Sequence, residues 1–208
     1  MAKFFANAPF DARTVSASFY PVFVENNIAT NFGVNGTGFD GVTYPQYVLV
    51  DGDSEQGAYQ LALGGEFTIS VTPTGTVQYL SVAQGEDFLF YFSELNADIE
   101  DFQQSILSPI EPGIVHPALL QALSGDDQIS LSGGADYFDA AGGFDQVLYN
   151  GTRADYTVTQ GEGGQVDVQS GFVEADHDTL DNVEKLTFSD GSLVFDSSAN
   201  ADFAYRIY

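Results

Sequence analysis

Cysteine is absent from the 208-residue chain, and its absence excludes disulfide frameworks, zinc–thiolate sites, iron–sulfur clusters and cysteine nucleophiles. Tryptophan is absent too, and the two histidines, His116 and His177, have no second histidine at a metal-binding spacing. The chain also lacks a Gly-x-Ser-x-Gly nucleophile elbow and a glycine-rich phosphate loop. Its 30 acidic side chains offer many carboxylate pairs for hydrolysis, but nothing singles out one of them. The sequence therefore predicts a protein that is not an enzyme.

Basic residues are scarce, with five Lys and Arg against 30 Asp and Glu, which gives a formal net charge of −25. Such a chain is repelled by nucleic-acid phosphates and by anionic lipid, so we expect it to bind neither. No apolar run approaches the ~20 residues that span a bilayer, so no transmembrane segment is predicted. Residues 1–9 carry one charge and a short, interrupted apolar stretch. They make a poor cleaved secretion signal, and any export is expected to use another route.

Apolar residues are plentiful, at 44% of the chain with 18 Phe and 11 Tyr, enough to build a folded core. Runs rich in β-branched and aromatic residues alternate with turn chemistry, which predicts strands. The strands expected in the first half span 47–50, 59–63, 67–71, 76–82 and 88–92, with an acidic hairpin tip at 51–57. Short helices are expected only at 98–107 and 117–123. The predicted fold class is mainly β.

The prolines indicate a boundary between two parts of the chain. Three of the seven prolines fall within residues 108–117, and proline cannot join the ladder of a central strand. We therefore expect an N-terminal antiparallel β domain over 1–107 and a Pro-rich connection over 108–121. A repeat region is expected over 122–148, followed by a β cap and C-terminal segment over 149–208.

The repeat region carries a Gly-x-Asp-x-apolar unit with a period of nine residues. Its three copies are Gly125-x-Asp127-x-Ile129, Gly134-x-Asp136-x-Phe138 and Gly143-x-Asp145-x-Val147. This pattern resembles the calcium-binding nonapeptide of the RTX (repeats-in-toxin) family, which forms a short parallel β-roll. The resemblance implies a degenerate roll over 122–148, closed by a β cap of the kind that residues 149–196 resemble.

In that family one coil takes two nonapeptides, so turns on one side lie eighteen residues apart. The resemblance therefore implies that two turns hold one Ca²⁺ between carboxylate and carbonyl oxygens. The residues of these turns are Ser124, Gly125 and Asp127 in the first, and Gly142, Gly143 and Asp145 in the second. Gly134 and Asp136 would lie on the other side, where the partners of Asp136 would fall at Ala118 and Ala154, which carry no carboxylate.

The chain departs from the family at the first two glycines of each nonapeptide. These positions hold Ala122-Leu123, Leu131-Ser132 and Ala140-Ala141, which narrows the backbone freedom of the turns. A degenerate roll that packs without metal is therefore the alternative to a calcium-binding one.

The family resemblance also implies a function and a place. RTX proteins leave the cell by a type I route, so we expect an extracellular or cell-surface protein. Together with the acidity, the repeats favour a calcium-assisted structural or adhesive component of a surface layer, filament or adhesin that self-associates. A non-catalytic module of a larger secreted enzyme is another alternative.

Residues 57–107 resemble the sheet of secreted haemophores more weakly, which makes a haemophore-like small-molecule binding protein a further alternative. In this resemblance the axial tyrosine position is held by Ile69 and the supporting histidine position by Gly75, and no histidine precedes His116. Haem binding is therefore not expected, and the tyrosines of this half are interpreted as aromatics of strands.

Overall fold

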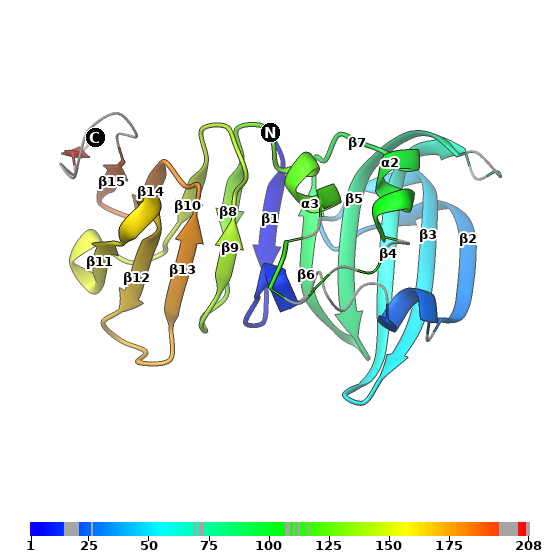
Figure 1. Cartoon of the computed structure of the whole chain (residues 1–208), viewed down its shortest axis with the longest axis horizontal. Coiled ribbons are helices and arrows are strands. Elements are labelled where there is room, and N and C mark those ends of the chain that lie inside the picture. The colour runs from blue at the N-terminus through cyan, green and yellow to red at the C-terminus, as the bar shows by residue number, and fades with distance from the viewer. Residues whose placement is uncertain are drawn as a thin grey trace. The chain divides into compact units, whose positions relative to one another are not determined.

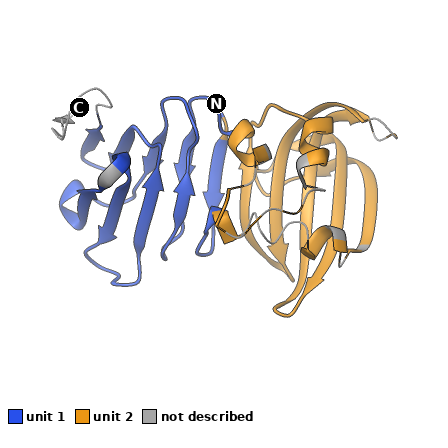
Figure 2. Ribbon diagram, viewed as in Figure 1, with its two compact units in different colours: residues 1, 3–12, 123–208 blue, residues 2, 13–122 orange. Residues whose placement is uncertain are grey.

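The computed structural model describes residues 1–14, 21–25, 27–68, 70, 73–106, 109, 111, 113–115, 117–195 and 204–206. Strands dominate these residues, so the prediction of a mainly β chain is confirmed. The chain divides into two units, which Figure 2 shows in separate colours. Unit 1 contains residues 1, 3–12 and 123–208, and unit 2 contains residues 2 and 13–122.

Unit 1 contains a run of parallel strands in the order β1, β8, β10, β14 (Figure 1). Their bounds are Lys3–Ala6, Gln128–Ser130, Gln146–Leu148 and Lys185–Phe188. Beyond β14 the sheet continues antiparallel with β15, Gly191–Val194, and β16, Ala204–Arg206. β8 and β10 pair Ile129 with Val147, so these two parallel strands are two nonapeptides apart.

A second sheet of unit 1 is ordered β11, β12, β13, β9. Its strands span Tyr156–Gln160, Val166–Ser170, His177–Asp181 and Tyr137–Asp139. β9 and β13 are parallel and place Phe138 opposite Leu180, whereas the other pairs are antiparallel. Short helical turns at Arg153–Asp155 and Glu162–Gly164 precede β11 and β12.

The core of unit 1 is built from one apolar side chain in each short strand. Each three-residue strand of the repeat buries its central residue and leaves its two neighbours half-buried. In register, Ile129 lies between Phe4 and Val147, and Val147 lies next to Leu186. All four are at most 2% exposed. The acid-x-apolar spacing thus places an acid at the turn and, two positions later, an apolar side chain in the core.

Unit 2 is an antiparallel sheet in sequence order from β2 to β6. These strands span Asn27–Thr37, Thr43–Ser54, Gly57–Thr68, Thr74–Gln84 and Asp87–Ser93. A short strand, β7 at Ala97–Asp98, also pairs with β5. The predicted hairpin with an acidic tip is confirmed, and it closes where Ser54 pairs with Gly57.

One strand of this sheet is longer than the sequence predicts. β4 runs without interruption from Gly57 to Thr68, so it joins the strand expected at 59–63 to the first two residues of the strand expected at 67–71. Its register shifts at Gly64 and Gly65, so the bulge breaks the alternation of apolar residues without ending the strand. Ile69 and residues 71–72 lie outside the described residues.

Both predicted helices are confirmed, as α2 at Ile99–Ile106 and α3 at Pro117–Ala122. Oδ1 of Asp98 accepts the backbone N–H groups of Glu100 and Asp101, at 2.8 and 3.3 Å, and so caps α2. A further helical turn spans Pro21–Glu25. Within the described part of the chain, no helix is long and apolar enough to cross a bilayer.

The N-terminal segment lies with the repeats rather than with the residues that follow it. The sequence groups residues 3–12 with the first domain, but β1 pairs with β8 and Asp11 forms a parallel bridge with Tyr137. Residues 13–122 therefore form a unit inserted between two stretches of unit 1.

Candidate functional site

The two turns that the repeat predicts to share an ion are stacked in the structure. Gln128 and Gln146 pair in register, which places Asp127 beside Asp145. The backbone N–H of Asp127 donates a 2.7 Å hydrogen bond to Oδ1 of Asp145. Asp127 is 3% exposed and Asp145 is 0% exposed. The two carboxylates thus lie at neighbouring buried positions, as the eighteen-residue spacing predicts.

The second oxygen of Asp145 has an unusual environment. Oδ2 of Asp145 is buried and accepts no hydrogen bond, and Oδ2 of Asp127 is buried as well. A buried carboxylate oxygen without a partner costs folding free energy, because it has left water and gained no donor in return. A proton or a cation would remove that cost.

The stacking also requires a glycine at one of the predicted positions. Gly143 has φ +142°, and a Cβ there would come within 2.3 Å of the Gly125 carbonyl oxygen. By contrast, a Cβ at Gly125 or at Gly142 would meet nothing within 4 Å. Ala141, where the family has glycine, has φ +65°, a conformation that an L-residue adopts at some cost. Ser124, the first residue named for these turns, is exposed.

A third acid continues this edge, and the sequence did not reveal it. The backbone N–H of Asp145 donates a 2.8 Å hydrogen bond to Oε2 of Glu184. Asp145 and Glu184 therefore each accept the backbone N–H of the preceding acid on this edge. Glu184-x-Leu186 repeats the acid-x-apolar spacing of Asp145-x-Val147, and this shorter pattern could have revealed it without the glycine.

The opposite edge carries a second carboxylate pair, Asp136 and Asp178. Oδ1 of Asp178 accepts the backbone N–H of Asp136 at 3.2 Å. Oδ2 of Asp178 accepts the Tyr149 hydroxyl at 3.0 Å. Asp136 in turn accepts hydrogen bonds from the Phe10 N–H and from both the N–H and the hydroxyl of Ser132. Each of the four oxygens of these two carboxylates thus accepts a hydrogen bond from the protein.

These contacts correct the expected neighbours of Asp136. The sequence placed Ala118 and Ala154 beside it, because it assumed an uninterrupted eighteen-residue period. The structure places Phe10 on one side and Asp178 on the other, because residues 149–176 leave the coil to form β11 and β12. Gly134 of this turn is held close to Pro9, whose Cγ a Cβ would meet at 2.7 Å.

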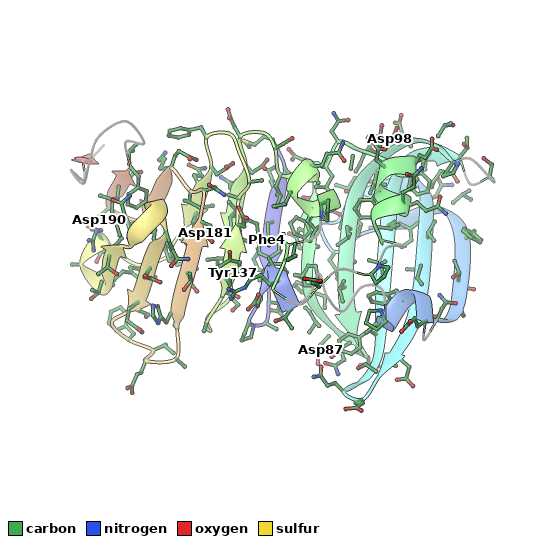
Figure 3. All side chains as sticks on the ribbon, viewed as in Figure 1. Phe4, Asp87, Asp98, Tyr137, Asp181 and Asp190 are labelled. Carbon is green, nitrogen blue, oxygen red and sulfur yellow. The ribbon has the colours of Figure 1, made fainter. Side chains whose placement is uncertain are left out.

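The strands beside this second pair are joined by further side-chain bonds. The Tyr137 hydroxyl donates to Oδ2 of Asp181 at 2.5 Å, and Figure 3 labels both residues on the neighbouring strands β9 and β13. Thr179 donates to Oδ1 of Asp167 at 3.1 Å, across β12 and β13. The carboxylates of this edge therefore take part in hydrogen bonds that join neighbouring strands, which is a structural role.

Burial sets the electrostatics of both pairs. It is the main reason why the pKa of Asp145 is raised to about 7; the N–H of Asp127 opposes this shift, and the charges of Asp127 and Glu184 add to it. Burial likewise raises the pKa of Asp178 to about 8, with the charge of Asp136 as the next cause. The pKa of Asp136 is raised by burial as well. Each pair therefore resists carrying two negative charges near neutral pH.

The donor set fits a calcium ion in part. Carboxylate oxygens are ligands that Ca²⁺ prefers, and it takes six to eight oxygens in all. Among the described residues, no group of three or more His, Asp or Glu side chains is arranged to hold a metal. The carbonyls of Asp127 and Asp145 already accept the N–H groups of Gln146 and Glu184, at 2.9 and 3.1 Å. Ligands beyond the carboxylates would have to come from other carbonyls of the turns.

The histidine within the described residues lies near a carboxylate of β12, outside the two stacked turns. His177 lies on β13 with a half-exposed side chain, and its Nε2 is 3.7 Å from Oδ1 of Asp167. His116 lies outside the described residues.

The first half of the chain has the packed tyrosines that the sequence predicts. Tyr79 is 0% and Tyr44 5% exposed, and their rings stack at 5.2 Å. The Tyr44 hydroxyl donates to Oδ2 of Asp40. Gly75 lies in β5 with φ +118° against the Glu66 carbonyl, and Ile69 lies outside the described residues.

Comparison with known proteins adds no relative. No protein-family model, curated protein or solved structure gave a significant match to the chain.

Proposed function

We propose that the chain is a calcium-assisted structural or adhesive component of an extracellular surface, with unit 1 acting as a short RTX-type β-roll closed by a β cap. The observation that supports this most is the buried Oδ2 of Asp145, which accepts no hydrogen bond beside a second buried carboxylate. Export by a type I route and self-association into a surface assembly belong to the same proposal. No catalytic step is part of it.

Calcium would act here as a counter-charge. Asp127 and Asp145 would hold the ion with carbonyl oxygens of the turns, and Glu184 lies next along the same edge. When bound, the ion would supply two positive charges to carboxylates that burial otherwise drives toward protonation. An ion that binds only the folded state stabilises it by ~2.7 kcal/mol at a hundredfold excess over its dissociation constant.

The alternative is a roll that packs without metal. One oxygen of Asp145 already accepts a backbone N–H, and the same holds for Asp136, Asp178 and Glu184. In that case the acids of the repeat serve as acceptors between coils, and a proton on Asp145 replaces the cation.

Thermal unfolding at pH 8 separates these two cases. Calcium at millimolar concentration should raise the melting temperature, EDTA should lower it, and magnesium should have a smaller effect. Asp145→Asn should remove most of the response to calcium, while it keeps an oxygen that accepts the N–H of Asp127. The matched change on the other edge, Asp136→Asn, should preserve the response, because both oxygens of Asp136 are already bonded. Identical melting curves in calcium and EDTA would exclude the calcium-assisted function.

Assembly is tested separately. Light scattering and electron microscopy of the whole chain, with and without calcium, should reveal larger particles in calcium. A strictly monomeric chain in both conditions would contradict the assembly part of the proposal and leave the ion site standing.

A further inference from the structure

Unit 2 contains a cavity of about 560 Å³ that the proposed function does not use. One face of the sheet lines it through Val48 and Val50 of β3 and Leu61 and Leu63 of β4. Helix α2 and the helical turn at Pro21–Glu25 contribute Ile99, Phe102 and Phe23. Small-molecule sites in proteins have volumes of roughly 300–1,000 Å³, so this cavity has the size of a ligand site.

The alternation of strand β3 assigns this cavity to one face of the sheet. Val48 and Val50 line it, whereas Tyr47 and Leu49 line a separate cavity of about 290 Å³. Successive side chains of a strand point to opposite faces. Substitutions at neighbouring positions of β3 therefore act on one cavity and spare the other.

The chemistry of the lining restricts the kind of ligand. Most lining side chains are apolar, and the polar ones are neutral hydroxyls and amides: Asn27, Thr30, Thr68, Ser70 and Gln103. Among the described residues, none that lines the cavity is charged. An ionised group moved into such a site loses its hydration and gains no counter-charge.

The net charge of unit 2 also disfavours an anionic ligand. Residues 13–122 contain 13 acidic side chains and one basic side chain, Arg13. Their summed field repels anions from the surface through which a ligand must enter. A fatty-acid carboxylate or haem, with its two carboxylates, is therefore disfavoured both at entry and inside the cavity.

We propose that this cavity binds a neutral, largely apolar small molecule that ends in a hydroxyl or amide group. The apolar side chains of β3, β4 and α2 bury the body of the ligand, and this burial supplies the affinity. The threonine, serine and amide side chains offer hydrogen bonds to its polar end. This site lies wholly within unit 2 and does not depend on the carboxylates of unit 1.

A neutral fluorescent probe, N-phenyl-1-naphthylamine, tests the site on the whole chain. Its emission should rise and saturate at one probe per chain. Val50→Phe fills the cavity and should weaken binding at least about tenfold. The matched control, Leu49→Phe, changes the adjacent half-buried position on the opposite face and should leave binding unchanged within about twofold. Should Val50→Phe fail to fold by circular dichroism, Thr30→Phe at an exposed lining position serves the same test. Absence of saturable binding, or equal binding by both variants, would overturn the proposal.

The ligand class is tested by competition at pH 8. 1-Decanol and decanoate differ only at the end group. 1-Decanol should displace the probe at lower concentration, because the cavity offers no counter-charge to a carboxylate. Equal or better competition by decanoate would show that the site accepts a carboxylate and would overturn the assignment of a neutral ligand. Calcium and EDTA should leave both titrations unchanged, which separates this site from the proposed calcium function.

Discussion

The two units treat their acidic side chains in opposite ways. In unit 1, Asp127, Asp136, Asp145 and Asp178 are each at most 3% exposed. In the described residues of unit 2 no carboxyl is buried, although that unit carries 13 acids. The net charge of −25 is therefore made of two populations. A solvated majority is screened by salt over ~8 Å. A buried minority is linked to the folding of unit 1, where Asp136, Asp145 and Asp178 accept backbone N–H groups.

Unlike their acids, the apolar cores of the two units should be packed equally well. Substitutions in these cores give the largest expected effect on stability. Ile129→Ala in unit 1 and Leu80→Ala in unit 2 each truncate a side chain that is 0% exposed. Each should lower the free energy of unfolding by ~2–5 kcal/mol, measured by urea denaturation. Ile114→Ala, at a position that is 50% exposed, is the control and should cost less than ~0.5 kcal/mol. A cost for Ile129→Ala close to that of the control would show that the core of unit 1 is not packed.

The buried carboxyls predict a pH dependence that belongs to unit 1. The folded-state pKa values of Asp145 and Asp178, about 7 and about 8, exceed the ordinary aspartate value, so the folded state binds protons more tightly than the unfolded state. Without calcium, the free energy of unfolding should therefore fall as the pH rises from about 4 to about 8.

Asn variants identify the groups responsible for this loss. Asp145→Asn should reduce the loss between pH 4 and 7, and Asp178→Asn should reduce it over the wider range up to pH 8. Asp87→Asn, at an exposed acid of unit 2, is the matched control and should leave the profile as it is. If the control flattened the profile as much as the unit 1 variants, surface repulsion would be the cause and the two populations of acids would not differ.

The glycines of the stacked turns give the smallest predicted effect. Gly143→Ala places a methyl group 2.3 Å from the Gly125 carbonyl at φ +142°, whereas Gly125→Ala meets nothing within 4 Å. Alanine at Gly143 should lower the free energy of unfolding by more than ~1 kcal/mol, and alanine at Gly125 should change it much less. Melting temperatures of the two variants in EDTA measure the difference. Equal melting temperatures would contradict the close stacking of the two turns.

Much of the fold was predictable because local patterns determine it. The strands around Ile129, Phe138 and Val147 follow from acid-x-apolar spacing, and α2 follows from its apolar positions. The neighbours of Asp136 were not predictable in this way, because they depend on where the chain leaves its nine-residue frame. Asp178 re-enters the same edge 42 positions after Asp136, and no count of nines leads to it.

The pairing of the N-terminal strand β1 with β8 could not be predicted from the sequence for a related reason. β1 carries no glycine and no acid of the repeat, so its sequence resembles that of any edge strand. Its pairing with β8 depends on Phe4 reaching the register of Ile129. A contact between residues so far apart in the sequence leaves no periodic trace in a single chain.

The insertion of residues 13–122 into unit 1 has a consequence for the order of folding. The hydrogen bond from Phe10 to Asp136 joins residues 126 positions apart, so the first coil can join the roll only by closing a loop of more than a hundred residues. Loop closure of this length costs entropy and slows folding. If unit 2 folds first, most of this loop is already ordered, and less chain entropy is left to lose when the first coil joins the roll. We therefore expect unit 2 to fold before the parallel strands that flank it in sequence.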